Sequence, residues 1–395
     1  MTDNYYKIGD YISVIDNRNT DGSITKLMGI SIDKCYIPSV ANVIGTDLSN
    51  YKVIQRGQFA CSLMQVSRDQ RIPIAMYEDD DPAIMSPAYV MFEVSRPDVM
   101  LPEYMELWFK RAEFDREASF YAVGGVRGSL DWEDFCKMEL PVPPLSEQRT
   151  IVRDYQVITD RIELLRKMNE NLTACCGVNY QVMLDGFTEE SDKDDLPEGW
   201  TIGSIGSYCD LKSGYAFKSE WWTDNGFKVI KIANIVDNAI DLDSCDSVID
   251  EHAKLAKLFY SVPGDIFIAM TGATTGKIGI LPFCKDRVVV NQRVGKFFLG
   301  KEPIKKAPFL FATLLSPRVV RRLQPDGMAG SAQDNLSADD IKNVAIVVPD
   351  TSTIEEFNIN NQSIIESIMT NDAELRLLHK LLDLLLSKIA VQIGA

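Results

Sequence analysis

The stretch Pro143-Pro144-Leu145-Ser146-Glu147-Gln148-Arg149-Thr150-Ile151 indicates where a long helix begins in the middle of the chain. The two prolines end any preceding strand, because proline cannot donate to a sheet ladder. Ser146 is the predicted N-cap, and Glu147 places a negative charge at the positive end of the helix. Seam positions, all apolar except Asn169, then recur with spacings of four and three at Ile151, Tyr155, Ile158, Ile162, Leu165, Asn169 and Leu172. This heptad seam predicts a rod of about 40 residues, or about 60 Å, which separates two other parts of the chain.

A second heptad seam occurs near the C-terminus. The predicted helix starts near Ile354, and its seam runs through Ile365, Ile368, Asp372, Leu375, His379, Leu382, Leu386 and Ile389. Because a connecting domain lies between the two helices, we expect them to pack as an antiparallel coiled coil. Polar Asn169 and His379 would then help to fix their register, although His379 could equally lie at a solvated end of the seam.

The two halves of the chain repeat each other with an offset of about 206 residues, which indicates a duplicated domain rather than a solenoid. The segment Val53-Ile54-Gln55-Arg56-Gly57-Gln58-Phe59-Ala60 is similar to Ser261-Val262-Pro263-Gly264-Asp265-Ile266-Phe267-Ile268, and Met138-Glu139-Leu140-Pro141-Val142-Pro143 to Val344-Ala345-Ile346-Val347-Val348-Pro349. Glycine, proline and asparagine break each half into short strands with a few helices. We expect strands at 228–232, 265–270, 277–281 and 288–290, and helices at 102–112 and 308–315 and near Ser129 and Ser337.

The predicted fold class is therefore α+β, with two duplicated mixed α/β domains joined by two long helices. An acidic segment at 188–198, which closes with Leu196-Pro197-Glu198-Gly199-Trp200, marks a domain boundary. The expected divisions are 1–143 for the first domain, 144–187 for the central helix, 188–349 for the linker and second domain, and 350–395 for the C-terminal helix.

Composition constrains the setting and the binding partners. The formal net charge is −16, which argues against a generic nucleic-acid coat, but residues 196–349 balance 18 Lys and Arg against 17 Asp and Glu. Any DNA binding would therefore depend on local patches or on partner chains. The eight cysteines form no CxxC pair, the N-terminus lacks the features of a signal peptide, and no apolar run reaches about 18 residues. We expect reduced thiols, a cytoplasmic location and no membrane span.

Met270-Thr271-Gly272-Ala273-Thr274-Thr275-Gly276-Lys277-Ile278-Gly279 looks like a phosphate-binding loop but fails the pattern at two positions. GxxxxGK[ST] requires glycine where Thr271 stands and Ser or Thr where Ile278 stands. Nucleotide hydrolysis is therefore not expected. The segment is better interpreted as a turn between two strands, with exposed amides and hydroxyls, which is either purely structural or touches a phosphate or a base edge.

Catalytic motifs are missing from the sequence. His252 and His379 are the only histidines, and the chain contains no HExxH, zinc-ligand spacing, GxSxG or GxGxxG. It also lacks the Asn-Pro-Pro-aromatic run of enzymes that methylate amino groups of DNA. We expect no catalytic residue, no cofactor and no metal, and interpret Glu78-Asp79-Asp80-Asp81 as a solvated turn rather than a metal site.

Polar loops flanked by aromatic residues recur at matching places in both halves. Arginine, lysine, asparagine and glutamine contact phosphates and base edges, so these loops are candidates for DNA binding, the alternative at each being a solvated loop. In the first half, Arg127 after a glycine pair is the strongest candidate. The candidate DNA-binding residues are Arg18, Arg68, Arg71, Arg127, Lys212, Tyr215, Lys218, Lys231, Asn234, Thr274, Thr275, Lys277, Gln292, Arg293, Gln333 and Asn335.

Taken in order, these features resemble the specificity (S) subunit of type I restriction-modification systems over nearly the whole chain. The most specific parts are the Pro-Leu-Ser-Glu-Gln-Arg stretch at 144–149, the Leu-Pro-Glu-Gly-Trp stretch at 196–200, and Gly264-Asp265-Ile266 followed by Gly272-Ala273-Thr274-Thr275-Gly276. The second helix start, Pro349-Asp350-Thr351-Ser352, departs from the pattern because it lacks Leu-x-Glu-Gln. The first domain also lacks Leu-Pro-x-Gly-Trp and the glycine-rich turn.

The resemblance implies two target-recognition domains, each reading one half of a bipartite site in double-stranded DNA. It implies that the helices space these domains and dock two methyltransferase (M) subunits, which motor/nuclease (R) subunits then join. Adenine methyltransferase and endonuclease activity would belong to those partner chains. The alternatives are a coiled-coil adaptor whose duplicated domains bind protein, which the acidic balance favours, and a fused modification enzyme, which would need a cofactor motif.

Overall fold

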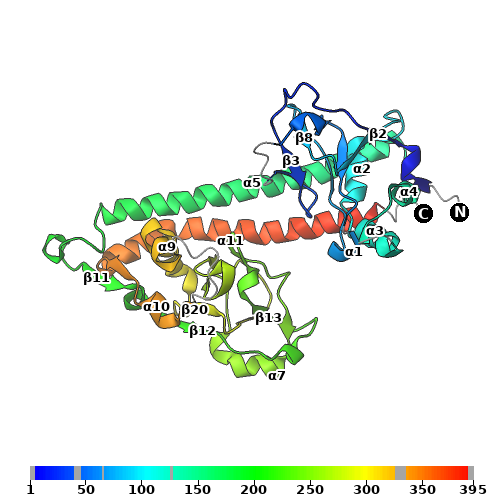
Figure 1. The fold of residues 1–395 in the computed structure, drawn as a ribbon. Helices are drawn as coiled ribbons and strands as arrows, with labels where there is room; N and C mark the ends of the chain where they lie inside the picture. The colour runs from blue at the N-terminus through cyan, green and yellow to red at the C-terminus, as the bar shows by residue number, and fades with distance from the viewer. Residues whose placement is uncertain (1–4, 40–45, 65, 125–127, 325–334, 390–395) are drawn as a thin grey trace. The chain divides into compact units, whose positions relative to one another are not determined.

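The computed structural model describes residues 5–39, 46–64, 66–124, 128–324 and 335–389. The chain forms two compact units, Met1–Asp160 with Lys380–Ala395 (unit 1) and Arg161–His379 (unit 2). Two long helices, α5 (Leu145–Leu184) and α11 (Thr351–Lys388), each contribute to both units (Figure 1). Helices and sheets are mixed in each unit, which confirms the α+β class.

Unit 1 is built around a four-stranded antiparallel sheet in the order β2-β9-β6-β7. These strands are Ile12–Ile15, Val90–Val94, Phe59–Cys61 and Ile74–Met76. Smaller antiparallel pairs join β1 (Tyr5–Lys7) to β10 (Glu139–Pro141), β3 (Met28–Ile30) to β4 (Tyr36–Pro38) and β5 (Lys52–Ile54) to β8 (Ala83–Met85). Helices α1 (Val66–Asp69), α2 (Pro102–Phe109), α3 (Ala112–Tyr121) and α4 (Trp132–Lys137) complete it.

Unit 2 contains a six-stranded sheet in the order β12-β20-β17-β18-β15-β14. These strands are Asp210–Ser213, Val294–Phe298, Ile266–Ala269, Ile278–Ile280, Asn238–Ile240 and Ile235–Val236. A three-stranded sheet contains β16 (Ser247–Val248), β13 (Phe227–Ile230) and β19 (Val288–Val290), and β11 (Thr201–Ser204) pairs with β21 (Ala345–Val348). Its short helices are α6 (Ile205–Tyr208), α7 (Asp250–Ala253), α8 (Ala307–Leu315), α9 (Pro317–Leu323) and α10 (Ala338–Lys342).

The two units share a strand order. The order β2-β9-β6-β7 in unit 1 corresponds to β12-β20-β17-β18 in unit 2, with all neighbouring pairs antiparallel. In each unit the first strand also pairs antiparallel with the strand that precedes a long helix, β1 with β10 and β11 with β21.

Several local predictions need correction at their boundaries. Helix α5 begins at Leu145, and the Pro144 carbonyl accepts hydrogen bonds from the amides of Glu147 and Gln148, so Ser146 lies within the first turn and is not the N-cap. The helix predicted near Ser129 begins later, with Asp131 as its N-cap, whereas the helix predicted near Ser337 does begin there, with Ser337 as its N-cap. The strand expected at 228–232 ends at Ile230, and the helix expected at 102–112 ends at Phe109.

Gln148 explains why the first helix begins where it does. Its side chain is fully buried, accepts a hydrogen bond from the Leu101 amide at 2.8 Å, and donates to the carbonyls of Val99 (2.7 Å) and Pro143 (2.8 Å). Buried polar groups need such partners. One glutamine thus ties the start of α5 to the chain just before α2.

The second long helix is capped differently. Asp350 accepts hydrogen bonds from the Ser352 and Thr353 amides at 2.9 and 3.2 Å and from Trp200 Nε1 at 3.2 Å. Hydrogen bonds from the hydroxyls of Ser352 and Thr353, and smaller contributions from the amides of these two residues, hold the pKa of Asp350 well below its usual range. Aspartate therefore takes the capping role here, and Trp200 joins the start of unit 2's domain to the start of α11.

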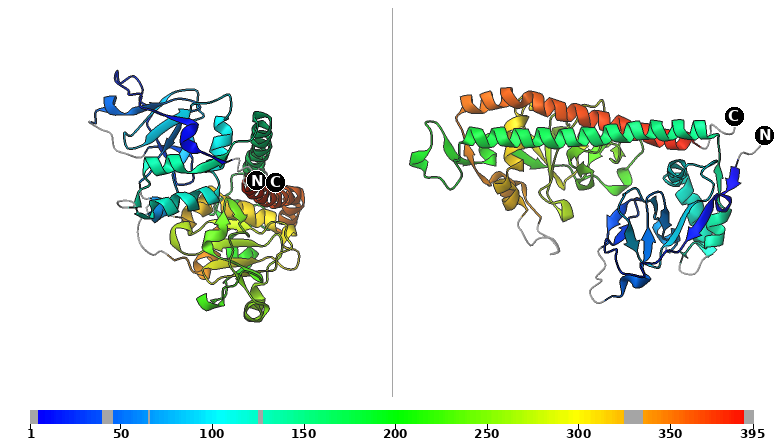
Figure 2. Two further views of the ribbon diagram at one scale, coloured as in Figure 1. Left: turned by 90° about the vertical axis from the view of Figure 1, so that its right-hand side faces the viewer. Right: turned by 90° about the horizontal axis from the view of Figure 1, so that it is seen from above.

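Within unit 2, residues 161–184 of α5 and 351–379 of α11 lie side by side and run antiparallel (Figures 1 and 2). Asn169 donates to Asp372 at 2.7 Å and accepts from Asn371 at 2.8 Å, while Asn179 donates to Asn361 at 2.7 Å. Asn169 thus contacts the other helix. His379 is exposed, with Nε2 3.4 Å from an Arg166 nitrogen, which matches the solvated alternative.

Asp372 is a buried carboxyl group between the two helices that lowers the stability of the protein at neutral pH. Its Oδ2 is buried with no hydrogen-bond partner among the described residues, and burial, with a smaller contribution from Asp237, raises the pKa of its carboxyl to about 7. The folded state therefore holds a proton that the unfolded state, with a pKa near 3.9, releases. This carboxyl favours folding at low pH, and its contribution is lost as pH rises from about 4 to 7.

Replacing Asp372 with asparagine is expected to stabilise the protein above pH 7 by about 1–3 kcal/mol, because it removes a buried charge and keeps the oxygen that Asn169 contacts. The variant should also flatten the fall in stability between about pH 4 and 7. Urea unfolding at several pH values would measure both effects, with Asp383→Asn at an exposed position of α11 as the control. An unchanged pH dependence would contradict this account.

Candidate nucleic-acid interface

A cavity of about 300 Å³ in unit 2 contains several of the predicted DNA-contacting positions. Aromatic, cationic and amide side chains all line it. The lining residues are Phe217, Ser219, Trp222, Lys231, Ile232, Ala233, Asn291, Gln292 and Arg293. A base or a phosphate group can be contacted by this combination of groups.

Two parallel strands place these residues together. Strands β13 and β19 pair in parallel, with Ile230 opposite Val290, so the residues that follow each strand emerge at the same edge of the sheet. Lys231 follows the first strand, and Asn291, Gln292 and Arg293 follow the second. Ligands commonly bind at the carboxyl ends of parallel strands.

The turn at 291–294 is firmly built. The Asn291 amide donates to the Ile230 carbonyl at 2.9 Å, and its Oδ1 accepts from the Arg293 amide at 3.3 Å. Gly214 passes so close that a Cβ there would lie 2.4 Å from the Asn291 carbonyl oxygen. Only glycine fits at this crossing, which explains why the Lys212–Lys218 region can border the cavity.

The two cationic side chains at the cavity, Lys231 and Arg293, differ in whether an ion pair already occupies them. Lys231 forms an ion pair with Asp246, and its Nζ lies 3.9 Å from the centre of the Trp222 ring. Gln292 and Arg293 are exposed, and Arg293 has no ion-pair partner among the described residues. The side chain best placed to meet a phosphate or a guanine edge is therefore Arg293.

Asn234 has a structural position instead. It is 3% exposed, its Oδ1 accepts from the Lys231 amide at 2.7 Å, and its Nδ2 donates to Ser244 Oγ at 2.9 Å. Both polar atoms of its amide have partners inside the protein, and the residue is buried, so Asn234 supports Lys231 rather than facing DNA.

The phosphate-loop look-alike is the turn between antiparallel strands β17 and β18, as expected. Thr275 Oγ1 donates to the Gly272 carbonyl at 2.7 Å, and the Thr271 and Thr274 hydroxyls are buried with no partner among the described residues. The expectation of exposed hydroxyls is therefore wrong for Thr271 and Thr274. Lys277 is exposed at the end of this turn.

The remaining candidates of unit 2 lie on neighbouring segments. Lys212 is on β12, with Nζ 3.4 Å from Asp210, and Tyr215 packs edge-on against Phe217 at 5.1 Å. Lys218 Nζ is 5.4 Å from the Trp221 ring. Asn335 is exposed. Gln333 lies outside the described residues, as does Arg127 of the first half.

The arginines predicted in unit 1 are engaged in local ion pairs. Arg18 contacts Asp16 at 2.7 Å, Arg68 contacts Asp69 at 2.7 Å, and Arg71 contacts Asp33 at 2.8 Å. All three remain at least one-third exposed, so a phosphate can compete with these surface pairs, which are individually weak.

The acidic turn of unit 1 carries local ion pairs. Asp79 pairs with Lys26 and Asp80 with Arg56, which fits the prediction of a solvated turn. Within the described ranges, no group of three or more His, Cys, Asp or Glu residues is arranged to hold a metal ion. Over the same residues, no helix is both long and apolar enough to cross a membrane.

Trp222 and Ser219 line the cavity but were not among the candidates. The signal available in the sequence was the Trp221-Trp222 pair, since nucleic-acid bases can stack on aromatic side chains. Trp221 in fact stacks on His252 with ring centres 4.2 Å apart, and only Trp222 reaches the cavity.

The sequence of this chain is similar to those of known type I specificity subunits. Residues 197–385 match the family described as type I restriction modification DNA specificity domain. The chain is 26% identical over 232 residues to the type I restriction enzyme MjaVIII specificity subunit of Methanocaldococcus jannaschii, covering 56% of this chain and 53% of that one. It is 22% identical over 306 residues to the MjaIX specificity subunit of the same organism, covering 74% and 69%. The chain thus matches about half the length of the first relative.

Among solved structures, the S subunit of a type I restriction-modification system from M. genitalium aligns with a TM-score of 0.55. That alignment has 13% identity and covers 98% of this chain and 95% of that one. At this identity the alignment indicates a shared fold.

Proposed function

Because the chain belongs to the specificity subunits of type I restriction-modification systems, we propose that it reads a bipartite site in double-stranded DNA, one part with each half of the chain. The chain itself would catalyse nothing. Methyltransferase and motor/nuclease subunits would bring adenine methylation and DNA cleavage, and the assembly would work in the cytoplasm.

The shared strand order supports the proposal that the two halves are duplicated target-recognition domains. The strands β2-β9-β6-β7 and β12-β20-β17-β18 have the same order, and neighbouring strands are antiparallel in both. The sequence segments that repeat between the two halves are separated by about 206 residues. We retain 1–143 and 188–349 as the recognition segments, and 144–187 and 350–395 as the helical segments that form the coiled coil.

The observation that carries the DNA-reading proposal is the cavity at the edge of β13 and β19. It combines exposed Gln292 and Arg293 with Lys231 and with the rings of Phe217 and Trp222. From the sixteen candidates we therefore propose Lys231, Gln292 and Arg293 as the primary contacts of the second half. Lys212, Tyr215, Lys218, Thr275, Lys277 and Asn335 would border them.

An exposed apolar stripe on α5 supports docking of methyltransferase subunits on the helices. Leu164, Met168, Val178 and Val182 are 49%, 40%, 57% and 72% exposed, and Cys175 is exposed on the same stripe. The spacing repeats in threes, fours and sevens, as expected of a face that accepts another helix. The coiled-coil adaptor without DNA binding remains the alternative, and the net charge of −16 favours it.

Replacing Arg293 with alanine is expected to reduce methylation of the recognised site by about 10- to 100-fold, the effect of losing one bidentate base contact of about 1–3 kcal/mol. The assay is methylation of plasmid DNA by the full chain co-expressed with its methyltransferase subunits, followed by sequencing of modified bases. Arg287→Ala is the matched control, because Arg287 lies before the opposite end of the same strand and pairs with Asp250 at 2.7 Å.

Equal losses in Arg293→Ala and Arg287→Ala would contradict the assignment of the cavity. No sequence-preferred DNA binding by the wild-type complex in a gel-shift assay would instead favour the adaptor.

A further inference from the structure

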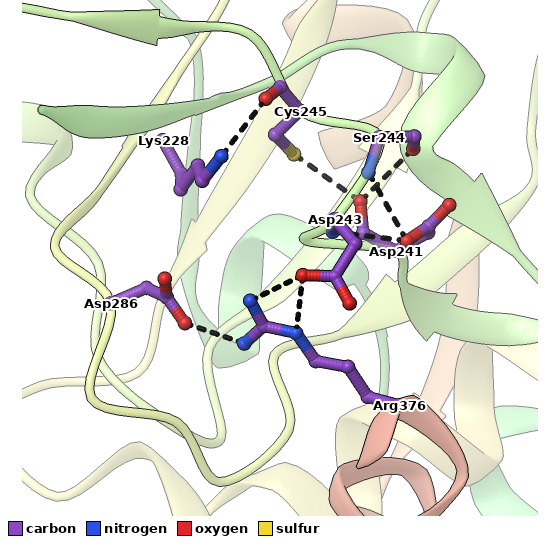
Figure 3. Close-up of polar contacts among 7 residues, drawn as sticks. All are labelled: Lys228, Asp241, Asp243, Ser244, Cys245, Asp286 and Arg376. Carbon is purple, nitrogen blue, oxygen red and sulfur yellow. Dashed lines mark hydrogen bonds and ion pairs between the residues drawn. The ribbon is translucent and has the colours of Figure 1, made fainter. Parts of the chain in front are cut away.

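Arg376 on α11 connects the helix to two loops of the second domain (Figure 3). Its Nε and Nη2 donate to Asp243 Oδ1 at 2.8 and 2.6 Å, and its Nη1 donates to Asp286 Oδ2 at 2.5 Å. The side chain is 21% exposed, and its two partners are 36% and 26% exposed. A planar guanidinium can hold two carboxylates in fixed directions at once.

The loop that contains Asp243 is itself rigid. Asp241 Oδ1 accepts from the amides of Asp243 and Ser244 at 3.1 and 3.4 Å, and the Ser244 hydroxyl donates back to the Asp241 carbonyl at 3.2 Å (Figure 3). Lys228 Nζ donates to the Cys245 carbonyl at 3.3 Å. A displacement of Asp243 would therefore move the whole segment 241–246.

The same segment supports the cavity from its other side. Ser244 Oγ accepts from the side chain of Asn234, which holds the Lys231 amide, and Asp246 forms the ion pair with Lys231 Nζ. Two contacts thus link the Arg376-bound loop to Lys231.

Asp286, the second partner, precedes strand β19. Five residues later the chain reaches Asn291 at the cavity, a distance of about 16 Å along an extended strand. Arg376 therefore contacts the segment that supports Lys231 and the segment that leads to Asn291, although it is not among the residues that line the cavity.

We propose that Arg376 is a positioning residue that fixes the reading surface of the second domain at one place along the C-terminal helix. The consequence, which rests on the proposed function, is a narrow tolerance for the distance between the two parts of the DNA site. Arg376 would determine the position of the second part of the DNA site relative to the first. Its base sequence would be determined by Lys231, Gln292 and Arg293.

The test is to sequence methylated sites made by the full chain co-expressed with its methyltransferase subunits, using a plasmid library in which the spacer between the two parts varies. Arg376→Ala should leave the base sequence recognised in the second part of the site unchanged. The ratio of methylation at spacers one base pair longer or shorter to methylation at the wild-type spacer should rise by about tenfold. Asp286→Asn, which keeps the Asp243 contact, should give a smaller change in the same direction and covers the case in which Arg376→Ala fails to fold.

Arg161→Ala is the matched control. Arg161 forms a two-bond ion pair with Glu374, which lies two residues before Arg376 on α11, but that pair connects the two helices and not the domain. It should leave the spacer profile unchanged. The inference would be overturned if both Arg376→Ala and Asp286→Asn gave the wild-type spacer profile, or if methylation fell equally at all spacers. A wild-type complex that recognises no bipartite site would instead overturn the proposed function.

Discussion

Replacing Lys296 with methionine is expected to lower the free energy of unfolding by about 3–5 kcal/mol, the cost of leaving a buried carboxylate without its partner. Lys296 on β20 and Asp265 are 6% and 4% exposed and lie 2.7 Å apart. Burial raises the pKa of Asp265, and Lys296 opposes that rise. Lys296 Nζ also donates to the Tyr260 carbonyl at 2.7 Å, so that carbonyl loses a donor as well.

Urea unfolding would measure the effect, with Lys277→Met as a control because Lys277 is exposed. The double variant Asp265→Asn with Lys296→Met removes both charges and should cost clearly less than Lys296→Met alone. The loss in the single variant should shrink at low pH, because a buried unpaired carboxyl takes up a proton in the folded state. A loss below about 1 kcal/mol at neutral pH would show that the pair is not important for stability.

Removing seven residues from each long helix is expected to abolish methylation at the wild-type spacer and to favour a spacer shorter by up to about three base pairs. Seven residues of helix span about 10.5 Å, and one base pair rises about 3.4 Å. A seven-residue deletion keeps the phase of the heptad seam. In unit 2, the pairing of Asn169 with Asn371 and Asn179 with Asn361 identifies the matching segments.

By that register, residues 156–162 correspond to 378–384, and their joint removal spares Asn169, Asp372 and Arg376. Copurification of the methyltransferase subunits checks assembly, and sequencing of methylated library sites checks the spacer. Deletion of 156–162 alone, which breaks the register, should reduce assembly. An unchanged spacer in a paired-deletion complex that still assembles would disprove the role of the helices as a ruler.

The sequence predicted the long helices well, because heptad spacing over many turns reflects a physical requirement of helix packing. The polar position Asn169 was also recognised. Its partners were not, because Asn371 and Asp372 become neighbours only through the antiparallel register. His379 belonged to the seam by spacing alone, and the structure places it in solvent.

Candidate DNA contacts were predictable as residue types in loops but not as a site. Asn234 and Arg293 looked equally suitable, since both are polar residues that follow predicted strands. Asn234 is buried and supports Lys231, whereas Arg293 is exposed at the cavity. Burial of a polar side chain depends on partners distant in sequence, such as Ser244, so local patterns do not reveal it.

By itself, the sequence predicted the long helices, most of the shorter elements and the resemblance to type I specificity subunits, because periodicity, turn residues and short motifs are local properties. The tertiary structure decided which residues act together. Parallel pairing of β13 and β19 brings Lys231 to Arg293, and Arg376 reaches from α11 to carboxylates 133 and 90 residues away. Such contacts form only when the chain folds back on itself, since the side chains involved have no spacing rule in sequence.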